Sequence, residues 1–583
     1  MSSLLRRLYD LVVERLRLDR LPLRSVPYSY VSIEFWLGAI VAASFMWLAI
    51  SGVLLLLYYD YTNPAEANRG LLESKPFFRP LLTSHLMAAN LMILGAVAHF
   101  ARNFLVGAYK KPREAVWIVG VITGFLALQT AFFGYASIGD KIAIEAINIG
   151  SGFVSNSFGE YFGKVLAALA FDVTESTRYL RVIAIHVAFA LLLGAAFLLH
   201  FTLFEAHGIH PSPRETGWRD EPSRIDETRK DIAPWFPVNF TYIIVVTLGV
   251  WGIIFTLSAF LQGLGWVHQL LYQLPIFEGT PESELARPMP PWFLVYAFKL
   301  FQLTFLYLPE PIRIPVMGLE LYGFSALPVF IASFVLPILV LAIIPFMARG
   351  GSTHPLDNMA ATATLGLLLV YLAQLTLWGA MTLGFHSTLT AAVVFIAPAL
   401  TLVPGLQMLK AAKEGENINK PAIRFLALSL LAIALPFATL IATRGYETDT
   451  GMGDAITGLL GVVFSLVYLG LVAFASFGGE SEPRREEYSP PDLPTPLIAV
   501  AIVELFLVVF SAISLTLVDP TASPILASAL IGLLLTSAYG VAHVAFRALT
   551  LHGKPLGSLG SELLPHSLVV LSLAVLIFVA LKI

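Results

Sequence analysis

Four histidines in the first third of the chain share one spacing. His85 and His99 are fourteen residues apart, and so are His186 and His200. Fourteen residues make almost four turns of α-helix, so each pair lies on one helix face, with about 21 Å between its members along the axis. Two such helices facing each other would present two His–His pairs, one near each surface of a membrane. Bis-imidazole ligation of two haem irons requires this arrangement.

Two glycine pairs repeat the same spacing on neighbouring apolar segments. Gly38 and Gly52 are fourteen residues apart, and so are Gly120 and Gly134. A flat macrocycle inside a four-helix bundle needs a close approach of the neighbouring backbones, which a residue without Cβ permits. The pattern therefore predicts glycines on the first and third helices and histidines on the second and fourth, around the same two macrocycles.

The composition places this pattern in a membrane protein. Of the 583 residues, 57% are hydrophobic and only 13% are charged, whereas about a quarter are charged in soluble domains. The absence of cysteine excludes disulfides, Cys-ligated iron–sulfur clusters and thiol catalysis within this chain. A net charge of −3 gives no indication of nucleic-acid binding.

Apolar runs of about 20 residues, long enough to cross a bilayer, recur along the whole chain. They predict an all-α polytopic membrane protein of about 14 transmembrane helices, of which the first four form a di-haem bundle. A segment at 137–180 lacks a strong period and is expected to be re-entrant or to lie on the surface. The predicted spans are 32–58, 81–106, 115–136, 181–204, 237–262, 291–308, 325–348, 358–383, 388–409, 422–443, 453–477, 495–517, 523–549 and 563–582.

Basic residues predict the orientation of the chain in the membrane. Residues 1–28 carry six arginines and apolar residues at helical spacing, so they are expected to form either an amphipathic helix on the membrane surface or a basic segment that only orients the first span. Both interpretations place the N-terminus in the cytoplasm. The basic loops at 110–113 and 205–235 then fall on the same side. A later basic cluster falls on the opposite side if all fourteen spans cross, so either one helix between 291 and 409 is miscounted or this loop departs from the rule. The cluster comprises Lys410, Lys413, Lys420 and Arg424.

Together these residues resemble the cytochrome b of quinol:cytochrome c and quinol:plastocyanin oxidoreductases. The resemblance covers residues 30–210 and extends more weakly to about 385. Its motifs are His85-x13-His99 with Arg102, Gly107-Ala-Tyr-Lys-Lys-Pro-Arg-Glu114, Gly120-x13-Gly134-Tyr135, and Arg181-x4-His186-x13-His200.

The resemblance implies that His85 and His186 ligate an outer haem iron, and that His99 and His200 ligate an inner one. It implies that quinol is oxidised at an outer site, that one electron crosses through both haems to an inner quinone site, and that a Rieske iron–sulfur protein accepts the other. Haem b is the default, and haem a occurs on related archaeal oxidase-associated subunits. Two guanidinium groups near these histidines are candidate partners of the haem propionates, Arg102 and Arg181.

The sequence departs from the family pattern in the outer quinol pocket. Pro290-Pro291-Trp292-Phe293 stands where the family has Pro-Glu-Trp-Tyr, and Ala136–Asp140 replaces the expected Pro-Trp-Gly turn. The pocket is therefore either rebuilt or inactive. Trp292 and Phe293 either line an apolar quinone groove or anchor the chain at the membrane interface.

Six polar residues are candidates for quinone chemistry by position alone. In a rebuilt outer pocket, the proton acceptor would be Asp140, Glu282 or Glu284, which would otherwise be ordinary loop charges. At the inner site, the resemblance points to His207 and Asp231, with His210 beside them; the two histidines are equally consistent with an exposed loop.

The chain thus divides into four parts. Residues 1–28 form the surface helix, 29–235 the di-haem core, 236–385 the cytochrome b-like helices of the quinone-site region, and 386–583 additional spans expected to dock other subunits. The predicted function is electron transfer from membrane quinol, as the cytochrome b subunit of a respiratory complex in the plasma membrane. The alternatives are an accessory haem-bearing electron conduit of a quinol terminal oxidase and a transporter without haem. The expected partners are a Rieske protein, other respiratory or oxidase subunits and membrane lipid.

Overall fold

The fold is that of a computed structural model in which most of the chain can be described. The described residues are 26–171, 177–210, 213, 217–218, 232–265, 274–280, 284, 289–308, 312–316, 319–348, 350–382, 386, 388–443, 449–477, 495–551 and 559–582. The predicted surface helix at 1–28 lies outside them except for its last three residues.

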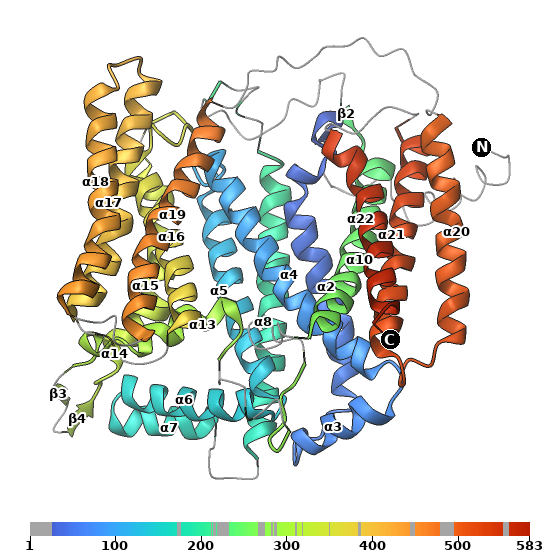
Figure 1. Ribbon diagram of the computed structural model, residues 1–583, viewed down its shortest axis with the longest axis horizontal. Helices are drawn as coiled ribbons and strands as arrows, with labels where there is room; N and C mark the ends of the chain where they lie inside the picture. Colours follow the sequence, from blue (N-terminus) through green and yellow to red (C-terminus); the bar gives the residue numbers. More distant parts are fainter. Residues whose placement is uncertain are drawn as a thin grey trace.

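Long helices run side by side through the molecule, and the predicted all-α membrane fold is confirmed (Figure 1). In the described part of the chain, 13 helical segments are long and apolar enough to cross a membrane. Four of them form the centre: α2 (Leu37–Leu56), α4 (Phe78–Leu105), α5 (Glu114–Ala136) and α8 (Arg178–His207).

The remaining long helices flank this centre on two sides (Figure 1). On one side lie α10 (Phe240–Leu264), α20 (Thr495–Leu517), α21 (Pro524–Leu549) and α22 (Leu559–Ala580). On the other side lie α13 (Trp292–Phe301), α14 (Leu327–Phe330), which continues through η6 (Ile331–Val335) into α15 (Leu336–Met347), α16 (Met359–Met381), α17 (Thr388–Lys413), α18 (Asn419–Ala442) and α19 (Asp449–Phe477). The helices after residue 386 therefore belong to two separate groups.

Short elements cover the ends of the long helices. Helices α3 (Pro64–Ser74), α6 (Lys141–Ser157) and α7 (Glu160–Ala170) lie across the lower end in Figure 1, which confirms the surface-lying segment expected after residue 137. Asp140 begins α6 by accepting a hydrogen bond from the backbone N–H of Ala143 at 2.9 Å. The other short elements are η2 (Tyr28–Tyr30), η3 (Ile33–Phe35), η4 (Trp235–Asn239), η5 (Thr304–Leu306) and the antiparallel pairs β1 (Val26–Pro27) with β2 (Ile232–Ala233) and β3 (Ile312–Val316) with β4 (Leu319–Gly323).

Small residues attach the last helices to the centre. A Cβ on Gly249 of α10 would lie 2.7 Å from Cδ1 of Tyr539 on α21, and one on Gly252 would lie 2.7 Å from Cγ2 of Thr536. Such close backbone approach is typical of helix pairs in membranes, where van der Waals packing drives association. The α20–α22 group is therefore packed tightly against α10.

The predicted span at 291–308 is wrong. Helix α13 has 10 residues and is about 15 Å long, half of what a bilayer requires. Its apolar composition reflects burial between other helices, since Leu294, Val295 and Ala297 are each at most 3% exposed. Hydropathy alone does not distinguish such a buried helix from a span. The described chain therefore has 13 spans, not 14.

This correction removes the conflict with the distribution of basic residues. With α13 not crossing, the α17–α18 connection falls on the same side as the α4–α5 loop. Hydrogen bonds between the loops agree, because Lys110 Nζ donates to the carbonyls of Gly350 and Ser352 at 2.7 Å each, and Asp357 pairs with Lys413 at the end of α17. The basic loop at 110–113 and the basic cluster at 410–424, which the structure describes, thus share one side.

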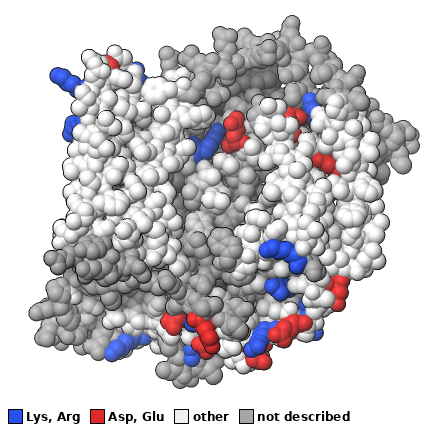
Figure 2. Space-filling view, viewed as in Figure 1, with Lys and Arg blue, Asp and Glu red and all other residues white. Residues whose placement is uncertain are grey.

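Charged side chains concentrate at the ends of the helices (Figure 2). On the face shown, described charges lie along the lower margin and in the upper part of the molecule, and the broad pale areas between them carry few. This distribution is expected for a chain whose middle faces hydrocarbon, where exposed charges are costly.

Single cysteines test this topology, because the chain contains none. We expect Lys111→Cys and Glu416→Cys to react with a membrane-impermeant maleimide from one side, and Thr62→Cys and Asp519→Cys from the other. All four positions are exposed in loops. The measurement compares labelling in intact cells with labelling in inside-out vesicles. If Glu416→Cys were labelled together with Thr62→Cys, α13 would have to cross the membrane.

Candidate functional site

Helices α2 and α4 pack so that each predicted glycine faces one predicted histidine. A Cβ on Gly52 would lie 3.3 Å from Cε1 of His85, and one on Gly38 would lie 3.2 Å from Cε1 of His99. Both distances are shorter than ordinary van der Waals contact. The glycines therefore make room for the imidazole rings themselves.

The same relation holds between α5 and α8. A Cβ on Gly120 would lie 3.0 Å from Cε1 of His200, and one on Gly134 would lie 2.9 Å from Cε1 of His186. The equal spacing of glycines and histidines follows, because each glycine on one helix accommodates one ring of its neighbour.

Hydrogen bonds orient three of the four rings. Nδ1 of His186 donates to the carbonyl of Thr130 at 2.8 Å, and Nδ1 of His200 donates to that of Val116 at 3.0 Å. Nδ1 of His85 lies 2.9 Å from the hydroxyl of Ser51. A proton on Nδ1 leaves Nε2 with its lone pair, which is the form in which histidine binds a metal.

The fourth ring, His99, has a different partner. The amide nitrogen of Asn103 lies 3.1 Å from Nε2 and 3.4 Å from Nδ1 of this ring. On α5, the accepting carbonyl belongs to the residue four positions before the glycine. The equivalent residue before Gly38 is Glu34, which precedes the start of α2 at Leu37, so its carbonyl is not part of that helix.

The histidines of α4 and α8 face each other at two levels. The ring centres of His99 and His200 are 6.4 Å apart, with the ring planes at 82°. A metal bound about 2 Å from a nitrogen of each imidazole requires ring centres roughly 6 Å apart. At the other level, His85 and His186 lie within range of each other's charge.

Each level offers two imidazole ligands and no more. Within the described segments, no group of three or more His, Asp or Glu side chains is arranged to hold a metal ion. Two imidazoles that face each other would suit a metal whose other ligands come from a macrocycle, as in haem. The donor set therefore fits haem better than a bare metal ion.

Two of the three arginines near these histidines lie at the α4–α5 end of the bundle. The guanidinium of Arg102 stacks 4.7 Å from the ring centre of Phe35, and its Nη1 lies 3.3 Å from Oδ1 of Asn103. Arg113, the last residue of the basic loop at 110–113, is only 4% exposed; burial lowers its pKa to about 10, and Arg102 adds to this effect. Arg181 lies in the first turn of α8, at the opposite end.

Asp140 is buried rather than exposed in a loop. It is 1% exposed, and its second oxygen accepts a hydrogen bond from the backbone N–H of Ile276 at 2.9 Å. It thus holds the 274–280 segment against the start of α6. Glu284 is exposed, whereas Glu282 lies outside the described residues.

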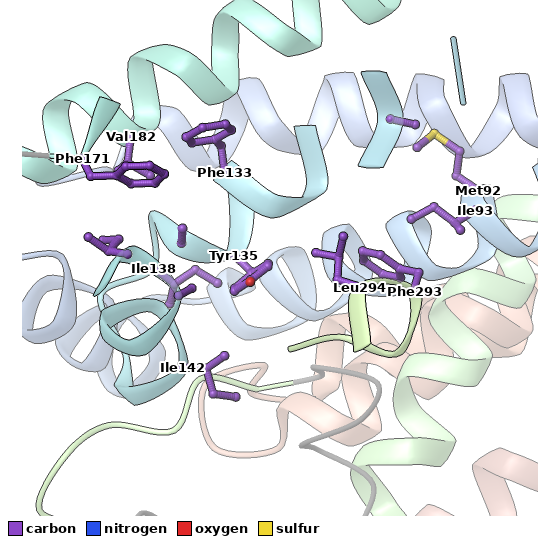
Figure 3. Packing of buried hydrophobic residues seen from close by; sticks show 14 of the residues in the cluster. Met92, Ile93, Phe133, Tyr135, Ile138, Ile142, Phe171, Val182, Phe293 and Leu294 are labelled. Atoms are coloured by element: carbon purple, nitrogen blue, oxygen red, sulfur yellow. The ribbon is translucent and has the colours of Figure 1, made fainter. Parts of the chain in front are cut away.

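Trp292 and Phe293 lie at the start of α13 in an apolar cluster. The indole N–H of Trp292 donates to Oδ1 of Asn90 on α4 at 2.8 Å. Phe293, 8% exposed, packs in one cluster with Met92, Ile93 and Tyr135 (Figure 3). Phe293 is therefore buried and Trp292 partly buried, both in an apolar cluster that includes residues of α4 and α5.

The inner-site candidates are only partly described. His207 is the last residue of α8, and its carbonyl accepts a hydrogen bond from Arg113 at 3.4 Å. His210, three residues further on, is partly buried. Asp231 lies outside the described residues.

The chain is similar in sequence to known cytochromes b. The family described as "Cytochrome b(N-terminal)/b6/petB" matches residues 90–268. The cytochrome b of Sulfolobus acidocaldarius is 33% identical over 407 residues, which cover 68% of this chain and 69% of that protein. The cytochrome b6 of Gracilaria tenuistipitata var. liui is 31% identical over 212 residues, which cover 35% of this chain and 97% of that protein.

A solved structure described as "Hyperthermophilic respiratory Complex III" covers 80% of this chain and 98% of its own, with a TM-score of 0.49 and 18% identity. The family assignment rests on the sequence relatives instead. Because a third of the residues are identical to the Sulfolobus protein over two thirds of both chains, this protein belongs to the cytochrome b family.

Proposed function

We propose that this chain is the cytochrome b subunit of a respiratory complex, which transfers electrons from membrane quinol across the bilayer through two bis-histidine haems. The observation that carries the proposal is the opposed pair His99 and His200, with ring centres 6.4 Å apart. His85 and His186 face each other at the second level of the same two helices, which supports a second site.

The side chains around each site have separable roles. Nε2 of His85 and His186 would hold one iron, and that of His99 and His200 the other, after the Asn103 amide has turned away. Haem, when bound, supplies reversible one-electron chemistry. The carbonyls of Thr130 and Val116 hold the ring protons on Nδ1. Arg102 at one end and Arg181 at the other are the proposed propionate partners.

Quinol would bind beside α13, where Trp292 and Phe293 belong to the apolar cluster of α4 and α5. An apolar pocket with few polar groups is typical of a site for a hydrophobic ring compound. Asp140 is the proposed polar group on this side, because its carboxylate is buried near the same cluster. His207 and Asp231 remain the candidates for the inner quinone site.

The distribution of positive charge supports an orientation in which the α4–α5 and α17–α18 loops and the N-terminus face the cytoplasm. The α6–α7 surface would then face outward from the plasma membrane. The proposed partners are a Rieske protein at that surface and other respiratory subunits along the flanking helices. Haem b is the default cofactor, and haem a would use the same ligands.

One observation favours a second candidate function. Pro291 occupies the position at which the family carries the proton-accepting glutamate. A chain whose outer pocket has lost that group would serve as an accessory electron conduit of a quinol terminal oxidase. The two functions differ in whether quinol reduces the haems of the purified chain directly.

Replacing one ligand should remove one haem. We expect His99→Ala or His200→Ala to halve the haem content measured by pyridine haemochrome and to abolish the inner haem signal, while the outer signal remains in the dithionite-reduced minus oxidised spectrum. His566→Ala is the matched control, because His566 is also an intramembrane histidine, on α22. An unchanged spectrum in His200→Ala would exclude this ligand assignment.

A methyl group placed against an imidazole ring should weaken haem binding without removing a ligand. Gly120→Ala should weaken the inner site and Gly134→Ala the outer site, since overpacking of about 1–3 kcal/mol corresponds to roughly five- to 150-fold in affinity. Gly124→Ala on the same helix is the control, because a Cβ there has nothing within 4 Å. Titration of each apoprotein with haemin, followed optically, measures the effect. Equal affinities in all three variants would contradict the proposed role of the glycines.

A further inference from the structure

A lysine is buried near the end of α13, away from the four histidines. Lys299 is 0% exposed. Its Nζ donates to the carbonyl of Thr382 at 2.9 Å, to the hydroxyl of Thr382 at 3.1 Å and to Oε1 of Gln302 at 3.2 Å. Burying an ammonium group at membrane depth is costly, so such residues are commonly functional.

A histidine stands between this lysine and a buried aspartate. Nε2 of His386 lies 2.5 Å from Nζ of Lys299, and Nδ1 of His386 lies 3.0 Å from Oδ2 of Asp454 on α19. The other aspartate oxygen accepts a hydrogen bond from Nε1 of Trp378 at 2.6 Å. His386 is 4% exposed and Asp454 is 8% exposed.

This order of groups is suited to moving a proton. The imidazole uses one ring nitrogen toward the ammonium and the other toward the carboxylate, and histidine can take a proton on one nitrogen while releasing one from the other. The remaining partners of the three side chains are Gln302, Thr382 and Trp378. Lys299, His386 and Asp454 therefore form a single hydrogen-bonded unit.

The aspartate end of the unit lies beside a cavity. Asp454 lines a space of about 30 Å³ between α17, α18 and α19, together with Thr390, Thr439 and Thr443. Such a volume holds one or two water molecules, which polar side chains can bind. Thr443, just past the end of α18, is exposed, so the cavity lies close to the surface at the end of the molecule opposite the basic loops.

The lysine end of the unit lies on the helix of the proposed quinol pocket. Trp292 and Lys299 are seven residues apart on α13, which is almost two turns, so they share a helix face about 10 Å apart. The unit thus extends from the helix beside the proposed quinol pocket to the outer surface of the flanking helices.

We propose that Lys299, His386 and Asp454 form a proton-exit relay that carries protons released by quinol oxidation to the outer surface. This inference rests on the proposed quinol-oxidising function. The Lys299 ammonium passes a proton to Nε2 of His386, whose Nδ1 proton moves to the Asp454 carboxylate. The resulting carboxylic acid releases its proton to water in the cavity. The neutral Lys299 amine then takes up a proton from the quinol side through water, and a water-mediated shift of the imidazole proton from Nε2 to Nδ1 restores the starting tautomer of His386.

The relay predicts a kinetic defect without a haem defect. In membranes containing the full complex, Asp454→Asn and Lys299→Met should retain the dithionite-reduced haem spectrum but slow the reduction of haem by quinol about a hundredfold or more, which is the lower end of the range for losing a proton-transfer group. The solvent deuterium isotope effect on that step should rise, because proton exit becomes rate-limiting. Formate should restore part of the rate in Asp454→Ala, since a soluble carboxylate can enter the enlarged cavity. A merely structural contact predicts neither the isotope effect nor the rescue.

The matched control is Glu504→Gln. Glu504 is also a buried carboxylate, 2% exposed, and it also pairs with a histidine, His566 at 2.7 Å, but it lies on α20, in the other flanking group. Its variant should reduce haem with quinol at the rate of the unaltered protein.

Several outcomes would overturn the relay. A haem-retaining Asp454→Asn or Lys299→Met with an unaltered quinol rate and isotope effect would exclude it, as would an equal defect in Glu504→Gln. If both variants fail to assemble, the relay is tested with the fraction of Asp454→Ala that retains haem. Rescue of its quinol rate by formate would support the relay, and absence of rescue would exclude it. An unaltered protein whose haems accept electrons from dithionite but never from quinol would refute the proposed function itself, a result distinct from failure of the relay alone.

Discussion

Four imidazole rings must fit between helices that are also packed closely enough to hold the bundle together. The glycine contacts show how both conditions are met, because a Cβ at any of the four positions would approach a ring carbon to 3.3 Å or less. The helix pairs α2–α4 and α5–α8 each satisfy the condition twice, at matched levels. The ring orientations, the hydrogen bonds at Nδ1 and the facing of α4 toward α8 all depend on this close approach.

The spacing of these residues was readable in the sequence because helix geometry converts residue number directly into position on a face. Hydropathy likewise located most spans. It failed for α13, since an apolar segment buried against other helices has the same composition as one that faces lipid. The basic cluster at 410–424 already indicated that one span before it had been miscounted. Which span this was became clear only from the length of α13.

The sequence alone could not predict features that depend on which helices become neighbours. Ser51, Thr130 and Val116 orient histidines on other helices, and nothing in their local sequence marks them. The unit of Lys299, His386 and Asp454 joins three segments that are distant in sequence. The sequence around His386 therefore gave no indication that a lysine and an aspartate would lie beside it. Asp140 was identified as a candidate, but its burial came from the contact with Ile276, which only tertiary structure reveals.

The flanking helices extend the central bundle in two different ways. On one side, Gly249 and Gly252 bring α10 and α21 into close packing that resembles a structural extension of the core. On the other side, α13 links the apolar cluster around Phe293 to a second cluster around Trp378. The second half of the chain thus contacts the first on two sides. The contact between α10 and α21 is mainly apolar, whereas the contact through α13 also contains charged side chains.

The facing of α4 and α8 at two levels has a thermodynamic consequence. Because both levels are carried by the same two helices, any ligand that fixes the distance between these helices at one level also reduces the cost of reaching it at the other. Binding at the two levels is then positively coupled, and the coupling free energy is the same whichever level fills first. The stiffness of α4 and α8 then determines how strongly binding at one level favours binding at the other.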